Sequence, residues 1–317
     1  MKRIHTIIVT YNAMKWAEKC FSSLRKSSIS VKTIVVDNGS TDGTQEYVKT
    51  NFPEVHFIQS PENLGFGKAN NIGIEVAYKE GADFFYLMNQ DAWLFQDSIQ
   101  ELLNVYNSYE DKEEIGILSP MHLDGSEKLL DFHFERYIAR STEENRAISG
   151  FYLGKMGSSF EINFVNAAHW FLPKQTVEIV GGFNPFFFHG AEDYDYANRV
   201  HFHKKKIIVA TKSKVVHDAK KLLKEKPAKE KLAEKRTSIR MQRETRYMNI
   251  TAPFDASAER KEFLSNITKL ALKGKIDESR FYREMYQYFN PLFPQIEKNR
   301  KIAAFEKHPF LNLIQPE

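Results

Sequence analysis

Short β-branched and aromatic runs alternate with helix-patterned segments between Ile4 and Met88, and this alternation constrains the fold more than any other feature. The runs that predict strands are Ile4 to Thr10, Lys32 to Val36, Val55 to Gln59 and Phe84 to Met88. Between the first two, Lys15 to Lys26 carries apolar residues at helical spacing. Alternation of this kind predicts a mostly parallel sheet with helices on both faces.

The last of these runs, Phe84 to Met88, ends abruptly in Asn89-Gln90-Asp91. The run suits a strand buried on both faces, and the tripeptide then falls at the carboxyl end, where open α/β sheets bind ligands. Two oxygen-bearing side chains one residue apart can hold a hard cation and, through it, a diphosphate. Asx residues after strands are more often turn formers, so the tripeptide alone leaves both interpretations open.

The same alternation raises a dinucleotide-binding alternative, which the glycine pattern counts against. That fold requires G-x-G-x-x-G, normally after the first strand. Here the first strand exits through Thr10-Tyr11-Asn12, which contains no glycine, and Gly65-Phe66-Gly67 is followed by Asn70 where the third glycine belongs. We therefore do not expect a nicotinamide-dependent enzyme.

Composition excludes several other classes. The 317 residues carry a net charge of +4 and one cysteine, Cys20. This charge is too small to indicate a nucleic-acid partner, and one cysteine excludes an intramolecular disulfide framework. Met1 to His5 enters the first strand without the apolar segment of a signal peptide, and no apolar run approaches the roughly 20 residues needed to cross a bilayer. We expect a soluble, cytoplasmic protein.

Several short motifs, in order along the chain, resemble glycosyltransferase family 2, and its rhamnosyltransferase-like branch in particular. The amino-terminal motifs are Ile8-Val9-Thr10-Tyr11-Asn12, Val36 to Thr44 (VDNGSTDGT) and Asn63 to Gly73 (NLGFGKANNIG). Later motifs are Gly181-Gly182-Phe183-Asn184, Phe186-Phe187-Phe188, Glu192-Asp193-Tyr194-Asp195 with Arg199, and Val215-Val216-His217. The resemblance implies a GT-A fold, which is a Rossmann-like mostly parallel sheet, and an inverting, usually metal-dependent transferase.

For the donor, the resemblance implies a nucleoside-diphosphate sugar bound at the strand ends. It places the nucleotide base at Asp37, although a carboxylate in this position also suits a turn that satisfies its own backbone. Glycines at a helix start let the backbone approach phosphate. The expected donor-binding residues are Thr10, Tyr11, Asn12, Asp37, Asn38, Gly65, Lys68, Asn70, Asn89 and Gln90.

The expected cofactor is a divalent cation, Mn²⁺ or Mg²⁺, held by Asp91 and His217. Asn89 stands where the family commonly has an aspartate, so one negative charge is missing and the strictness of the metal requirement stays open. For His217, the alternative is a partly buried histidine bonded to backbone; imidazole does tolerate Mn²⁺.

For catalysis, the resemblance implies that Asp193 is the general base and that Glu192 holds the acceptor or donor sugar. Acids in a first helical turn are also common because of the helix dipole alone. His169 and Trp170 are expected to shape the acceptor pocket, with core packing as the alternative.

We expect two domains: a GT-A domain over 1–218, with a variable insertion from Met121 to Phe160, and a helical carboxy-terminal extension over 219–317. Its helices are predicted at Lys220 to Tyr247, Ala256 to Lys273 and Glu278 to Phe289. Lysine runs usually form a solvated face. The alternative is a surface that docks peripherally on anionic lipid at the inner face of the cell membrane.

The predicted function is inverting transfer of a sugar from dTDP-rhamnose or a UDP-sugar to a hydroxyl of a glycan or lipid-linked glycan, in the synthesis of cell-surface polysaccharide. The alternative is a catalytically silent module that binds nucleotide sugars. Only the missing metal-binding acid at Asn89 supports that alternative, and retention of Asp91, Asp193 and His217 opposes it.

Overall fold

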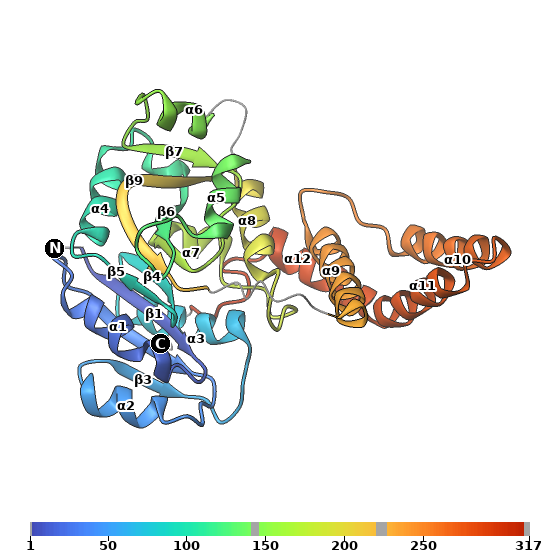
Figure 1. Cartoon of the computed structure of the whole chain (residues 1–317), viewed down its shortest axis with the longest axis horizontal. Helices are drawn as coiled ribbons and strands as arrows, with labels where there is room; N and C mark the ends of the chain where they lie inside the picture. The colour runs from blue at the N-terminus through green and yellow to red at the C-terminus, as the bar shows by residue number, and fades with distance from the viewer. Residues whose placement is uncertain (1, 141–145, 220–226, 314–317) are drawn as a thin grey trace. The chain divides into compact units, whose positions relative to one another are not determined.

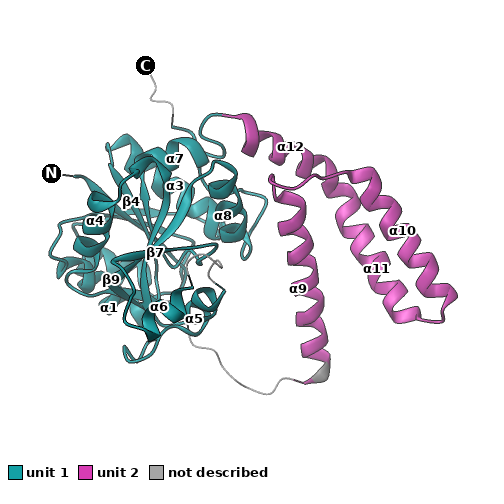
Figure 2. Ribbon diagram, turned by 90° about the horizontal axis from the view of Figure 1, so that it is seen from above, with its two compact units in different colours: residues 1–224, 307–317 teal, residues 225–306 magenta. Residues whose placement is uncertain are grey.

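The computed structural model describes residues 2–140, 146–219 and 227–313. The chain forms two compact units, coloured separately in Figure 2. Unit 1 comprises Met1–Lys224 and Lys307–Glu317, and unit 2 comprises Glu225–Glu306. Unit 2 is therefore inserted between two segments of unit 1.

Unit 1 is built on one mixed sheet whose strand order is β3-β2-β1-β4-β8-β6-β9-β5, with β7 paired to β9 (Figure 1). The strands are β1 (Ile4–Thr10), β2 (Lys32–Asp37), β3 (His56–Gln59), β4 (Phe84–Asn89), β5 (Ala92–Leu94), β6 (Ile115–Leu123), β7 (Ser159–Ile162), β8 (His169–Pro173) and β9 (Lys206–His217). Strands β3, β2, β1 and β4 are parallel, as are β6 and β9, whereas β8, β5 and β7 pair antiparallel to their neighbours.

Helices cover both faces of this sheet because alternate strand residues point to opposite sides. On β1, Ile7 packs with α3 (Phe66–Lys79), α7 (Lys174–Val180) and α8 (Glu192–Phe202). The next residue, Ile8, packs with the other layer. That layer consists of α1 (Met14–Arg25), α2 (Thr44–Asn51) and α4 (Ser98–Ser108). The expected α/β architecture of GT-A type is confirmed.

The strand order reverses at β1, because the chain first builds β2 and β3 on one side and then places β4 on the other. Open α/β sheets bind ligands at such a switch point, outside the carboxyl ends of the strands. Strands β4 and β6 are both antiparallel to β8, and β9 is parallel to β6. Strand β9 therefore runs in the same direction as β4. His217, at the end of β9, therefore lies at the same edge as Asn89.

The insertion between Met121 and Phe160 contains α5 (Phe132–Ala139) and α6 (Ala147–Tyr152), and ends by entering β7. The short helix η1 (Lys112–Glu114) precedes β6. Asp131 caps α5, accepting hydrogen bonds on Oδ1 from the amides of His133 and Phe134, both at 2.9 Å. Asp131 Oδ2 lies 3.6 Å from His217 Nδ1, so the start of α5 lies at the edge of the sheet where β9 ends.

The carboxy-terminal segment from Lys307 onward is part of unit 1. The Gly182 amide donates to Pro309 O at 2.9 Å, and Asn71 Nδ2 donates to Phe310 O at 3.2 Å. Leu313 is buried in the same cluster as α3 and α7. This packing was not expected from the sequence, which places everything after 218 in the extension.

Unit 2 is helical: α9 (Ala228–Met248), α10 (Ala256–Leu272), α11 (Ile276–Phe289), the short η2 (Asn290–Leu292) and α12 (Phe293–Phe305). Three of its helices were predicted and α12 was not; Lys220 to Lys226 of the first predicted helix lies outside the described residues.

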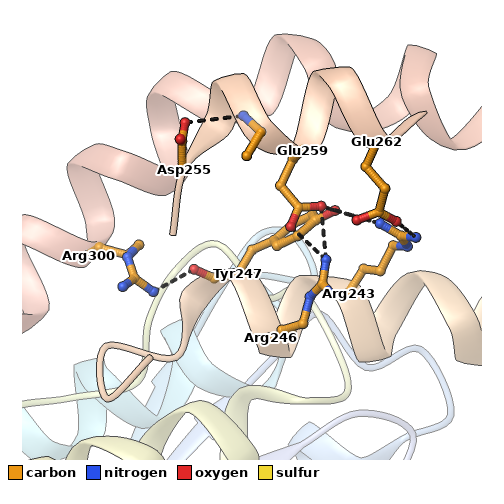
Figure 3. Close-up of polar contacts among 8 residues, drawn as sticks. Arg243, Arg246, Tyr247, Asp255, Glu259, Glu262 and Arg300 are labelled. Carbon is orange, nitrogen blue, oxygen red and sulfur yellow. Dashed lines mark hydrogen bonds and ion pairs between the residues drawn. The ribbon is translucent and has the colours of Figure 1, made fainter. Parts of the chain in front are cut away.

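Polar contacts join α9 to α10 within this unit. Glu259 accepts hydrogen bonds from Arg246 and from the Tyr247 hydroxyl, beside the ion pair of Arg243 and Glu262 (Figure 3). Among the described residues, no helix is both long enough and apolar enough to span a membrane.

Candidate functional site

A pocket of about 400 Å³ opens at the carboxyl edge of β1, β2 and β4. It is lined by Val9, Tyr11, Asn38, Asn63, Gly65, Phe66, Asn89, Gln90, Asp91, Phe188 and His189. Six of these residues were expected from the sequence: Tyr11, Asn38, Gly65, Asn89, Gln90 and Asp91. A pocket of this size lies within the range of small-molecule and cofactor sites.

The amino terminus of α3 forms one wall of the pocket. Gly65 precedes the helix with φ at +81°, and a Cβ there would lie 2.1 Å from Phe188 O. The Phe66 amide donates to the same carbonyl at 3.2 Å. Only glycine therefore allows the loop carrying Phe188 and His189 to pack across this helix start.

Asp37 does not present a free carboxylate to the pocket. It is fully buried and accepts hydrogen bonds from Thr10 Oγ1 at 2.8 Å, Ser40 Oγ at 2.5 Å and Gln45 Nε2 at 3.0 Å. The amides of Gly39 and Ser40 donate to it as well. The placement matches the alternative weighed for this residue, a carboxylate that satisfies its own turn. Thr10, also buried, is likewise turned toward Asp37.

Tyr11 and Gln90 join the ends of β1 and β4 at the floor of the pocket. The Tyr11 amide donates to Gln90 Oε1 at 2.7 Å, and Gln90 Nε2 donates to Tyr11 O at 3.1 Å. The Tyr11 side chain is 48% exposed. Asn12, at φ +52°, instead accepts the Thr41 amide on Oδ1 at 2.8 Å, so it ties the β1 end to the loop after β2.

Five of the expected donor-binding residues lie outside the pocket lining: Thr10, Asn12 and Asp37, described above, and two residues of α3. Asn70 is buried and its Nδ2 donates to Phe66 O at 3.0 Å within the first turns of α3. Lys68 is exposed on the same helix. Residues two positions apart point to roughly opposite sides of an α-helix, so Lys68 faces solvent where Asn70 faces the interior.

The candidate cation ligands converge beside the pocket. His217 Nε2 lies 3.7 Å from Asp91 Oδ1 and 3.4 Å from Asn89 Nδ2, and Asn89 Oδ1 is buried without a hydrogen-bond partner. An imidazole, a carboxylate and an amide oxygen suit Mn²⁺ or Mg²⁺. No group of three or more His, Cys, Asp or Glu side chains that could hold a metal occurs in the described ranges. An ion here would need Asn89 and the phosphates of a ligand to complete its coordination.

Glu192 and Asp193 begin α8 directly after the Phe188–His189 loop. Burial raises the pKa of Glu192. Burial, and then the charge of Glu192, raise the pKa of Asp193 to about 7. Ala191, which precedes them, has φ at +71°, a left-handed conformation that costs a non-glycine residue about 1–3 kcal/mol and often marks functional sites. Glu192 Cβ would be 3.9 Å from a Cβ on Gly67, so the acids lie beside the start of α3.

His169 and Trp170 are both fully buried, so neither side chain offers a surface to an acceptor. His169 Nδ1 bonds the Tyr86 hydroxyl at 2.6 Å, its Nε2 faces Val216 O at 3.1 Å, and burial lowers its pKa to about 3. Trp170 stacks on Phe183 in the core. This differs from the expected acceptor role: β8 is a central strand with both faces covered.

The fold is a mostly parallel α/β sheet of GT-A type. Two solved structures share this fold. S. aureus TarS 1-349 in complex with UDP aligns with 95% of this chain and 83% of its own, at a TM-score of 0.54 and 16% identity. GalNAc-T7 with UDP, GalNAc and Mn²⁺ aligns with 69% of this chain and 44% of its own, at a TM-score of 0.53 and 13% identity.

Residues 6–118 match the family described as Glycosyl transferase family 2. The chain is 31% identical over 122 residues to the dTDP-rhamnosyl transferase RfbF of Shigella flexneri, covering 38% of this chain and 39% of that protein. It is 30% identical over 127 residues to an N-acetylglucosaminyl-diphospho-decaprenol L-rhamnosyltransferase of Mycobacterium tuberculosis. That alignment covers 37% of this chain and 40% of the relative. The matched region thus spans about two fifths of these curated relatives.

Proposed function

We propose that this protein is an inverting glycosyltransferase that moves a sugar from a nucleoside-diphosphate donor to a hydroxyl of a glycan or lipid-linked glycan. The observation that carries the proposal is the pocket in which the strand-end residues Asn89 and Asp91 face the amino terminus of α3. A diphosphate suits that position because helix amides and their dipole favour anions. The names of the curated relatives favour dTDP-rhamnose as donor, with a UDP-sugar next.

In the proposed reaction, the acceptor hydroxyl oxygen attacks the anomeric carbon from the face opposite the diphosphate. The new C–O bond forms as the bond to the diphosphate oxygen breaks, and the hydroxyl proton passes to a carboxylate oxygen of Asp193. The configuration inverts, and the nucleoside diphosphate leaves with the bonding electron pair. A base with a pKa of about 7 is well matched to this task near neutral pH.

Other residues of the chain would bind the nucleotide, the cation and a sugar hydroxyl. Tyr11 offers an exposed ring in the pocket for the nucleotide, and Asp37 holds the turn after β2 rather than the base itself. Asp91 and His217 would hold the cation together with Asn89. When bound, a divalent cation supplies positive charge to the departing diphosphate. Glu192, buried beside Asp193, is placed to hold a sugar hydroxyl.

The alternative function is a catalytically silent module that binds nucleotide sugars. Binding and turnover measured on the same preparation distinguish it from an active transferase. A thermal-shift panel of UDP, dTDP and their sugars, with and without Mn²⁺ or Mg²⁺, identifies the donor. The selected donor is then assayed for hydrolysis, which a transferase performs slowly with water as acceptor. Donor binding without any hydrolysis or transfer favours the silent module; no nucleotide binding at all refutes both.

We further propose that unit 2 brings the enzyme to anionic membranes that carry a lipid-linked acceptor. Lys229, Lys231 and Lys235 are exposed on the amino-terminal half of α9. Basic side chains near a surface contribute about 1 kcal/mol each to binding of acidic bilayers. The acceptor named for the mycobacterial relative, a diphospho-decaprenol, is a lipid, which supports this placement.

A further inference from the structure

We propose that Asp131, supplied by the insertion, is the positioning residue that fixes the tautomer of His217, so that Nε2 presents a lone pair to the cation. This inference rests on the proposed function, because it concerns the same cation site. Nothing in the sequence motifs points to Asp131, which lies in the segment between Met121 and Phe160 that matches none of them.

The two oxygens of Asp131 face different partners. Oδ1 accepts the amides of His133 and Phe134 and so caps α5, whereas Oδ2 lies 3.6 Å from His217 Nδ1. Both side chains are almost entirely buried, at 3% exposure for Asp131 and 6% for His217. The cap anchors the carboxylate, so its second oxygen is held toward the imidazole.

The imidazole is placed between two carboxylates, and its two nitrogens have different neighbours. Nδ1 faces Asp131, while Nε2 faces Asp91 Oδ1 at 3.7 Å and Asn89 Nδ2 at 3.4 Å. Nδ1 is buried and lies just beyond hydrogen-bonding distance of any acceptor, with the Asp131 carboxylate facing it. A proton on Nδ1 would therefore point at a fixed negative charge, and the lone pair would remain on Nε2.

This arrangement is the one that metal-binding histidines use. Their second ring nitrogen commonly donates to a carboxylate, which fixes the tautomer and raises the basicity of the ligating nitrogen, and loss of that partner typically costs 10–100-fold in affinity. The Asp131 carboxylate, held by its cap on α5, faces His217 Nδ1 from the corresponding position.

The test uses Asp131→Asn, because asparagine caps helices about as well as aspartate. The Asn Oδ1 would keep the cap, but its Nδ2 would donate to His217 Nδ1. That reverses the tautomer and puts the proton on Nε2, where it blocks ligation. Asp255→Asn is the matched control, since Asp255 caps α10 with the same two-amide geometry and has no histidine partner.

Two readouts follow. Imidazole ¹⁵N shifts of metal-free protein at about pH 8.5, where histidine is neutral, are expected to show Nδ1–H for His217 in the wild type and Nε2–H in Asp131→Asn. Titration of MnCl₂ into protein holding UDP, and again dTDP, should show affinity about 10–100-fold weaker in Asp131→Asn and unchanged in Asp255→Asn.

A wild-type His217 that carries its proton on Nε2 overturns the proposal, whether or not the variant folds. Equal ¹⁵N shifts in wild type and Asp131→Asn overturn it too, as does equal Mn²⁺ affinity. If the wild type binds no Mn²⁺ with either nucleotide, the cation in the proposed function fails, and the metal-free tautomer still decides the role of Asp131.

Discussion

Glu192 and Asp193 begin α8 side by side, and the charge of Glu192 adds to burial in raising the Asp193 pKa to about 7. The helix amino terminus, which favours the ionised form, does not offset these two effects. Asp193 is thus close to half ionised at neutral pH, and its fraction in the basic form changes steeply there. This relationship gives the proposed reaction a defined dependence on pH.

Transfer is expected to rise with pH through about 7, because Asp193 accepts a proton only when ionised. Glu192→Gln removes the like charge while keeping the shape, so the Asp193 pKa should fall and the acidic limb of kcat/KM should move to lower pH. The measurement is a pH profile of kcat/KM for wild type and variant. A limb that stays in place would show that Asp193 does not control it.

Asp193→Asn keeps the size of the side chain and removes its basicity. Donor binding should survive, while transfer falls by roughly 10²–10⁴-fold. Calorimetric donor affinity measured beside turnover separates the two effects. Near wild-type turnover would move the proton-accepting role elsewhere, with Glu192 the next candidate.

Asp91→Ala removes the one full negative charge in Asn89-Gln90-Asp91. We expect metal-enhanced binding of UDP or dTDP to be lost, because His217 and Asn89 are both neutral ligands. The fold should persist, since the Asp91 side chain is 24% exposed and its backbone carbonyl still accepts the Asp218 amide. Calorimetry with and without Mn²⁺ tests this, and an unchanged metal dependence in the variant refutes the assignment.

Gly65→Ala should impair nucleotide binding and stability together. Alanine would adopt φ +81° and place its Cβ 2.1 Å from Phe188 O, so the pocket wall must move. Gly43→Ala is the matched control: it also has positive φ, +90°, but its Cβ meets nothing within 4 Å. The free energy of unfolding of the control should fall only by the cost of a left-handed alanine, roughly 1–2 kcal/mol. Urea unfolding and nucleotide titration of both variants distinguish strain from steric displacement.

Unit 2 should bind vesicles that contain anionic lipid, and rising salt should weaken that binding. Replacing Lys229, Lys231 and Lys235 on α9 by glutamate is expected to abolish it. The control replaces three other exposed lysines by glutamate, Lys261 and Lys269 on α10 and Lys273 just after it. The net charge changes by the same amount in both variants. Vesicle sedimentation is the assay. Binding that ignores lipid charge and salt, or equal losses in both triple variants, would leave α9 without this role.

The alternation of strands and helices in the first ninety or so residues was predictable because apolar periodicity is local. Strand bounds such as Ile4–Thr10 agree with the structure. The antiparallel position of β8 between β4 and β6 was not predictable, since pairing between segments far apart leaves no mark on local periodicity. Burial of His169 and Trp170 follows from that position, which the expectation of an acceptor pocket, drawn from the family resemblance, could not anticipate.

In the site, the strand-end residues Tyr11, Asn89 and Asp91 were predictable because every parallel strand delivers its carboxyl end to one edge. Their neighbours Phe188 and His189 were not, because a loop reaches the pocket only through tertiary packing on Gly65. The local signals were the glycine, which permits a close backbone approach without naming the partner, and the motif Phe186-Phe187-Phe188, which does not by itself reveal where the loop packs. The family that the motifs resemble is also the one that residues 6–118 match, Glycosyl transferase family 2.

The return of the chain from α12 to unit 1 has a consequence for how the protein is made. Leu313 packs into the core beside α3 and α7, and Pro309 and Phe310 accept hydrogen bonds from Gly182 and Asn71. During synthesis, the sheet and its helices emerge first, yet this face stays open until all of unit 2 has been translated. Unit 1 therefore reaches its final packing only after the whole of the helical unit has been synthesised.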